Sequence, residues 1–179
     1  LAGPYASLEL VRGVFWDSSL LYGGSSNEIE TAFWDGEFDT RRFLFDTSIS
    51  GQWYLDPATT LTPKLRAVYF SETVDDYAVE NENGDVLSFD GFLEEQLRVS
   101  LGAELARQYV LDNGLLLTPS LALTSGVSGL DGSGLFGSVG TGFALTDGGN
   151  WSLDAALRFN IEGEGETSGG ARLGLTVRF

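Results

Sequence analysis

Three residue types are missing from this chain of 179 residues: cysteine, histidine and methionine. Without cysteine, the protein has no disulfide framework and no thiolate metal site. Without histidine, it has no Ser-His or Cys-His catalytic pair and no histidine-rich zinc site. Carboxylates are abundant, but the sequence places no two of them in one pocket. We therefore expect no enzymatic activity, no metal site and no cofactor.

Positive charge and long apolar runs are also scarce. Lys and Arg number 10 against 26 Asp and Glu, a net charge of −16, and such a surface repels nucleic acid. Hydrophobic residues make up 42% of the chain, which is too much for acidic disorder. No apolar run approaches the roughly 18 residues of a transmembrane helix, but a transmembrane β-strand needs only about 9–11 residues of alternating character.

The two ends of the chain point to a strand protein cut from a longer one. The chain opens at Leu1 in mid-pattern, with neither an initiator methionine nor a signal peptide, so we expect a mature or trimmed piece. Residues 171–179 alternate apolar with polar or small side chains and stop on an aromatic residue. This period of two predicts a two-faced strand, and an aromatic end suits a lipid interface.

The same alternation recurs along the whole chain and predicts nine strands without a helix. Short turns follow the first, third, fifth and seventh strands. Longer connections are expected over 31–37, 73–85 and 163–170, and one of intermediate length over 125–134. Short turns at one end and long loops at the other are typical of an outer-membrane barrel, whose last strand then ends at the periplasmic side. The expected strands are 4–10, 14–28, 41–55, 61–72, 92–111, 115–124, 135–146, 151–162 and 171–179.

Alternation alone does not separate a membrane barrel from a soluble sandwich. Three features favour the barrel: some strands are long enough to cross a bilayer, aromatic residues recur near strand ends, and the polar face carries charges of both signs. The expected aromatic girdle is Trp16, Trp53, Tyr69, Tyr109 and Trp151. The expected lumen-facing polar residues are Lys64, Arg66, Arg98, Glu104, Asp154, Arg158 and Arg172. We predict an all-β, antiparallel up-and-down transmembrane β-barrel, with residues 1–179 as a single domain.

Short segments along the chain resemble the C-terminal translocator domain of bacterial autotransporters. None is specific alone, and their order over the whole chain carries the resemblance. They are Gly3-Pro4-Tyr5-Ala6-Ser7, Leu21-Tyr22-Gly23, Phe38-Asp39-Thr40-Arg41-Arg42, Ser50-Gly51-Gln52-Trp53, Leu61-Thr62-Pro63, Tyr69-Phe70-Ser71-Glu72 followed by Tyr77, and the ending on Phe179.

The resemblance implies a twelve-stranded barrel of type V secretion in the outer membrane of a Gram-negative bacterium. Its partners would be outer-membrane lipid, the barrel-assembly machinery and an N-terminal passenger that the barrel anchors and helps to export. A helix would thread the pore. Nine strands are about three short of twelve, and an odd number cannot close with all neighbours antiparallel. We therefore expect the first strands, the pore helix and the passenger to lie before Leu1.

Two site interpretations stay open beside this one. Leu173, Leu175, Val177 and Phe179 form the C-terminal assembly signal by resemblance, although the same residues also suit plain contact with lipid. The lumen charges either steer a passenger or ions, or pair across the barrel, and we favour pairing.

The acidic connection 72–85 has the residue types of a calcium loop at 81–85 but not its spacing. It is therefore better interpreted as a solvated loop.

Two other functions compete with translocation: a passive outer-membrane porin or small-molecule channel, and a soluble all-β binding domain. A translocator follows a long secreted passenger, whereas a porin follows only a signal peptide. Fractionation separates the soluble alternative from both.

Overall fold

The computed structural model describes residues 1–132, 134–163 and 165–178. Within them, nine strands form one sheet in the order β1-β2-β3-β5-β8-β10-β11-β12-β13, with all neighbours antiparallel. This confirms the predicted meander. Four short strands, β4, β6, β7 and β9, pair beside this path, so the sheet has thirteen described strands in all. The thirteen are β1 (Tyr5–Val11), β2 (Val14–Glu30), β3 (Asp35–Gly51), β4 (Trp53–Asp56), β5 (Thr59–Val74), β6 (Tyr77–Glu80), β7 (Val86–Phe89), β8 (Phe92–Arg107), β9 (Tyr109–Val110), β10 (Leu116–Leu130), β11 (Gly134–Thr146), β12 (Trp151–Ile161) and β13 (Thr167–Val177). The described residues contain no helix long and apolar enough to cross a membrane.

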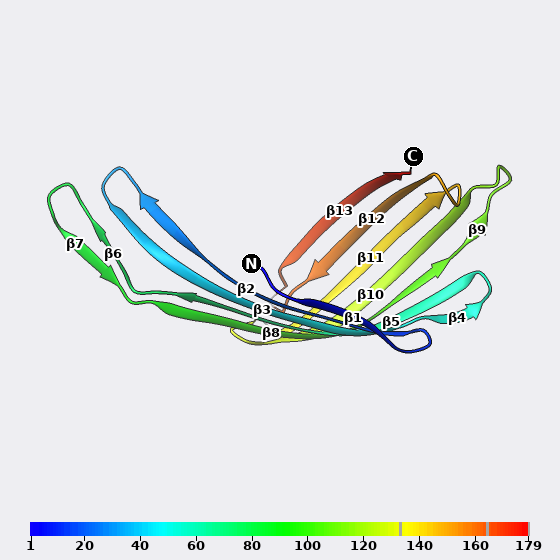
Figure 1. The fold of residues 1–179 in the computed structure, drawn as a ribbon, viewed down its shortest axis with the longest axis horizontal. Helices are drawn as coiled ribbons and strands as arrows, with labels where there is room; N and C mark the ends of the chain where they lie inside the picture. Colours follow the sequence, from blue (N-terminus) through cyan, green and yellow to red (C-terminus); the bar gives the residue numbers. More distant parts are fainter. Residues whose placement is uncertain (133, 164, 179) are drawn as a thin grey trace.

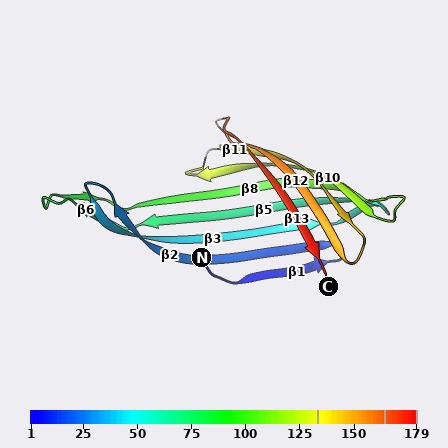
Figure 2. The same cartoon turned by 90° about the horizontal axis from the view of Figure 1, so that it is seen from above.

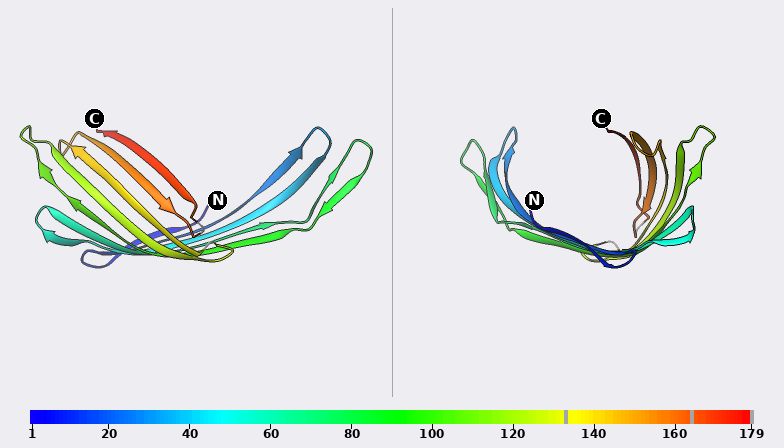
Figure 3. Two further views of the ribbon diagram at one scale, coloured as in Figure 1. Left: turned by 180° about the vertical axis from the view of Figure 1, so that it is seen from behind. Right: turned by 45° about the vertical axis from the view of Figure 1, so that its right-hand side comes forward.

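The sheet curls into a trough (Figures 1 and 3). Strands β1 and β13 are its free edges, and no other described strand pairs with their outer sides. Seen from above, β13 crosses the N-terminal strands in projection (Figure 2). It does not pair with them. Because neighbours alternate in direction, the first and the ninth strand of the sheet run the same way.

One expected loop, 125–134, is mostly strand, and another, 31–37, is shortened to residues 31–34. The sequence placed loops over 31–37 and 125–134, but β2 continues to Glu30, β3 starts at Asp35, and β10 continues to Leu130. The prediction was wrong because it followed side-chain polarity. Backbone pairing between β2 and β3 runs without interruption through these polar residues, and a ladder of backbone hydrogen bonds does not require apolar side chains.

The other two expected loops are partly strand. Within 73–85, β6 pairs with β3 and with β7, so the connection is a folded hairpin. Strand β13 begins at Thr167, inside the expected loop 163–170. The difference between the two ends of the sheet therefore lies chiefly in projecting hairpins rather than in irregular loops.

Two expected strands are each interrupted once near the short-turn end. The breaks fall at Gln52, between β3 and β4, and at Gln108, between β8 and β9. Each backbone N–H there donates to a turn of the neighbouring hairpin: Gln52 N to Gly13 O at 2.7 Å, and Gln108 N to Ala58 O at 2.8 Å. These bonds tie the turns together along that edge.

Side-chain burial is inverted relative to a soluble protein. Among the described residues, the buried hydrophobic side chains are Val74 and Val79, whereas strand residues such as Leu101 and Leu123 are 65% and 54% exposed. Polar Ser48, on the opposite face, is only 6% exposed. The accessible surface is 12250 Å², against about 8,400 Å² for a compact soluble protein of this mass. The apolar face therefore belongs in an apolar surrounding rather than in water.

Candidate lumen wall and lipid-facing surface

The polar face of the sheet lines the trough. Arg98 on β8 reaches Glu162, just after β12, with Nη2 to Oε1 at 2.8 Å. Strands β10 and β11 lie between them in the sheet, so the side chains bridge two strands, which the concave side permits. We call this polar, concave side the lumen face and the apolar, convex side the outer face.

The five predicted girdle residues lie on the outer face but at two different ends. Trp16, Trp53, Tyr109 and Trp151 gather at the short-turn end, opposite Ile49, Leu61, Leu117 and Val177 respectively. Tyr69 lies toward the other end, where it pairs with Leu97 and Phe45.

The polar groups of two of these rings have partners. The Trp16 indole N–H donates to the Thr47 hydroxyl at 2.9 Å, and the Tyr69 hydroxyl donates to the Glu95 carboxylate. Amphipathic rings at both ends of an apolar band suit the two interfaces of a bilayer.

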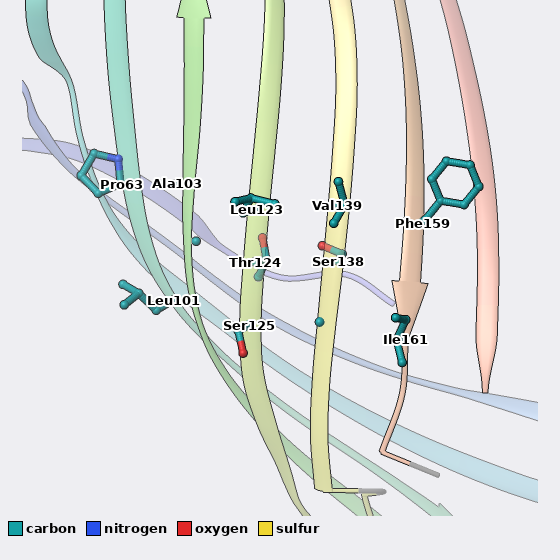
Figure 4. A pocket seen from close by; sticks show the side chains of 12 residues that line it. Pro63, Leu101, Ala103, Leu123, Thr124, Ser125, Ser138, Val139, Phe159 and Ile161 are labelled. Atoms are coloured by element: carbon teal, nitrogen blue, oxygen red, sulfur yellow. The ribbon is translucent and has the colours of Figure 1, made fainter. Parts of the chain in front are cut away.

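A groove of about 580 Å³ crosses the outer face (Figure 4). The groove forms because the small residues Ser125 and Gly137, which are paired in register, lie between the larger Leu101 and Ile161 in the same cross-strand row. Leu123, Val139 and Phe159 line the same groove. The lining is almost wholly apolar, which suits contact with hydrocarbon rather than with a polar ligand.

Four of the seven predicted lumen charges have ion-pair partners. Arg66 pairs in two-pronged fashion with Asp46, Arg98 with Glu162, and Arg172 with Asp154 at 3.2 Å. Each pair joins different strands, so it adds cross-strand contact inside the trough. Within the described residues, Lys64, Glu104 and Arg158 form no ion pair. Lys64 and Arg158 line a lumen hollow of about 430 Å³ together with Arg66 and Arg98.

A stacked contact on the lumen face was missed by the sequence prediction. The Phe136 ring lies against Gly126, where an added Cβ would fall 2.5 Å from the ring's Cζ. The Arg98 guanidinium sits 4.0 Å from the centre of the same ring. The available signal was a glycine opposite a lumen-facing aromatic, but recognising it required the register that pairs Gly126 with Phe136.

Carboxylates organise the turns at the short-turn end. Asp147 accepts the backbone N–H groups of Gly149, Trp151 and Asn150 at 3.0, 3.1 and 2.8 Å. These hydrogen bonds, that from Gly149 first, lower the pKa of Asp147 because they stabilise its charged form. The Ala58 N–H likewise lowers the pKa of Asp56.

The turn of the acidic hairpin between β5 and β8 is held by hydrogen bonds among its own residues. The Asn81 side-chain oxygen accepts the backbone N–H groups of Asn83 and Asp85, each at 2.9 Å. The residues of the expected 81–85 feature thus form a tight turn. Among the described residues, no group of three or more carboxylates is placed to hold a metal ion.

The last strand presents its predicted signal residues outward. Leu173, Leu175 and Val177 are exposed on the outer face of β13. Phe179 lies outside the described residues. The outer edge of β13 pairs with no described strand, so its backbone donors and acceptors stay open for another strand.

Comparison with known proteins identifies the family. The family model described as "Autotransporter beta-domain" matches residues 1–126, well over half of the chain. Comparisons with curated proteins and with solved structures gave no match. Members of this family are outer-membrane translocator barrels of type V secretion, in agreement with the antiparallel sheet and its exposed apolar face. The chain belongs to the autotransporter β-domain family.

Proposed function

We propose that this chain forms most of the wall of an outer-membrane barrel that anchors an N-terminal passenger and helps to export it through the lumen. The inverted burial supports this proposal most directly, because an apolar exterior around a polar trough suits a pore wall in lipid. The family match supports a passenger in the same protein. The role is structural and conductive rather than catalytic.

We propose further that the C-terminus lies on the periplasmic side. In outer-membrane barrels the short turns face the periplasm and the longer connections face outward. Strand β13 ends at the short-turn end, beside Trp151. The β2–β3 and β6–β7 hairpins project from the opposite end (Figure 1).

We propose that further strands, preceding Leu1, complete the barrel. Strands β1 and β13 run in the same direction, so an antiparallel seam requires an odd number of added strands, and three would give twelve. An open edge in lipid would leave backbone N–H and C=O groups without partners. The lumen would then also hold the segment that leads to the passenger.

Strand β13 is the proposed contact for the barrel-assembly machinery. Its free edge and its outward Leu173, Leu175 and Val177, with Phe179 at the end of the chain, supply both backbone pairing and an apolar surface. The five girdle aromatics would anchor the wall at the two lipid interfaces. The paired lumen charges would stabilise its inner side.

Surface exposure of the passenger tests the central proposal. The full-length protein, with an epitope in the segment before Leu1, is produced in a Gram-negative host. Protease is then added to intact cells. We expect outer-membrane fractionation and loss of the epitope. An epitope that stays protected while the barrel reaches the outer membrane would refute export and favour a porin, which conductance in planar bilayers would detect. A protein that is soluble without detergent would refute the barrel.

A further inference from the structure

Beyond the barrel wall, four strands form an extension in which the two faces exchange character: the outer face becomes charged, and the lumen side carries aromatic side chains. The extension comprises 25–30 of β2, 35–40 of β3, β6 and β7, joined in that order. Along the outer face of β3, Phe45 and Phe43 give way to Arg41, Asp39 and Glu37. The β2–β3 register has no irregularity over this stretch, so the side chains change character and the strand does not flip. This change marks where the outer face leaves lipid for water.

The lumen side of the extension carries an aromatic ladder, defined as Phe38, Tyr77 and Phe89. The Phe38 and Tyr77 rings are 5.4 Å apart, and Tyr77 stacks on Phe89 at 5.0 Å with an 18° interplanar angle. In the next row, Val79 is buried between Gly36 and Leu87. Phe89 and Leu87 nevertheless remain 44% and 47% exposed. A half-covered apolar surface in water, at the mouth of a pore, marks an interaction site.

Charge narrows the choice of what covers this surface. The extension's outer face and tip are strongly acidic, with Glu28, Glu30, Asp35, Glu37, Glu80, Glu82 and Asp85. These carboxylates repel phosphate-bearing lipid headgroups, and they repel a second copy of the same extension. The covering group is therefore a polypeptide with apolar side chains and no acidic excess.

The position of the ladder indicates which polypeptide would cover it, namely one that leaves the lumen. The ladder continues the lumen wall upward, because Phe38 lies on the same side of β3 as Arg42 and Asp46. The extension bends toward the concave side of the trough (Figures 1 and 3). Strand β7 offers an outer edge that pairs with no described strand, so it has backbone groups for an extended peptide.

We propose that the aromatic ladder and Leu87 form an extracellular docking face for the passenger as it leaves the lumen. The docked segment is extended and apolar, and it is covered by the ladder on one side and paired to the edge of β7. This inference rests on the proposed export function. It adds a specific contact that export alone does not require.

Site-specific photo-crosslinking tests the contact in the full-length protein in a Gram-negative host. Leu87 and Ser88 are adjacent but lie on opposite faces, so a photoreactive residue at 88 is the matched control for one at 87. We expect position 87 to crosslink to the passenger several-fold more than position 88. Equal yields with the passenger on the surface would overturn docking alone, as would crosslinks from 87 only to lipid or to another barrel. A passenger that never reaches the surface would overturn export and docking together.

Paired substitutions provide a second readout. The variant Tyr77→Ser with Phe89→Ser removes the half-buried Tyr77 ring and the exposed Phe89 ring. The control, Ala78→Ser with Ser88→Ala, alters the opposite face of the same hairpin. We expect the first variant to delay surface appearance of the passenger several-fold and the second to leave it unchanged. Equal timing in both variants would overturn docking. If the first variant lacks the SDS-resistant, heat-modifiable gel band of a folded barrel, the crosslinking comparison decides.

Discussion

Alanine at position 126 would place a methyl group in space that is already filled. Its Cβ would lie 2.5 Å from Phe136 Cζ and 2.5 Å from the Val99 carbonyl oxygen. The carbonyl belongs to the β8 backbone, so the ring is the part that can move. Moving the ring withdraws it from the Arg98 guanidinium, 4.0 Å from its centre.

The free-energy terms can be compared for this site. Overpacking costs about 1–3 kcal/mol, and an exposed cation–π contact contributes about 0.5–1 kcal/mol. Alanine in a strand gains about 0.5–1 kcal/mol over glycine. We therefore expect Gly126→Ala to destabilise the folded barrel by about 1–3 kcal/mol, or about 5- to 140-fold in the folding equilibrium constant.

Gly129→Ala is the matched control, since it lies on the same strand and its added Cβ would meet nothing within 4 Å. The assay is a urea titration of the full-length protein in lipid vesicles, scored by the gel shift between folded and unfolded barrel. Adding Phe136→Leu to Gly126→Ala should recover part of the loss, because the Val99 carbonyl remains in the way. The reasoning is refuted if Gly126→Ala is as stable as Gly129→Ala.

Three further predictions concern the outer face and the turns. Trp16→Phe removes the N–H donor to the Thr47 hydroxyl and should lower the unfolding free energy by about 0.5–1.5 kcal/mol; in the same urea assay, Thr47→Val also removes the donation of its hydroxyl to the Asp17 carbonyl oxygen at 3.2 Å, so the double variant should lose less than the sum of the two single losses, and full additivity would contradict the bond. Leu173→Lys puts a charge on the lipid face near the middle of β13 and should cost about 2–4 kcal/mol; Ser168→Lys, on the lumen face of that strand, removes an exposed hydrogen bond from the Asn160 amide and should cost at most about 1 kcal/mol, and equal losses would argue against the assigned faces. The lowered pKa of Asp147 means that its stabilising effect is complete above the unfolded pKa of about 4 and is lost as pH falls through the lower folded value; amide exchange at Gly149 should show this acid-induced opening in the native protein, and an identical pH profile in Asp147→Asn would exclude the carboxylate as its cause.

Much of the wall could be predicted from the sequence because alternation is a local property. A period of two assigns Leu101 and Leu123 to one face and Ser100 and Thr124 to the other whatever the partner strand. The nine strands, their antiparallel order and the outward position of the girdle aromatics followed from that period. Side-chain polarity predicted a loop where a strand continues into water, as at Asp35, because backbone pairing does not depend on apolar side chains.

The sequence by itself determined which residue types face lipid and which face the lumen. Only the tertiary structure decided which of them meet, because those contacts depend on strand register and on the curl of the sheet. Arg98 finds Glu162, 64 residues away, only because the trough brings β8 and β12 together. Phe136 rests on Gly126 only in the register that pairs them. The aromatic ladder forms only because β6 pairs with the start of β3, where polar side chains alone predicted a loop.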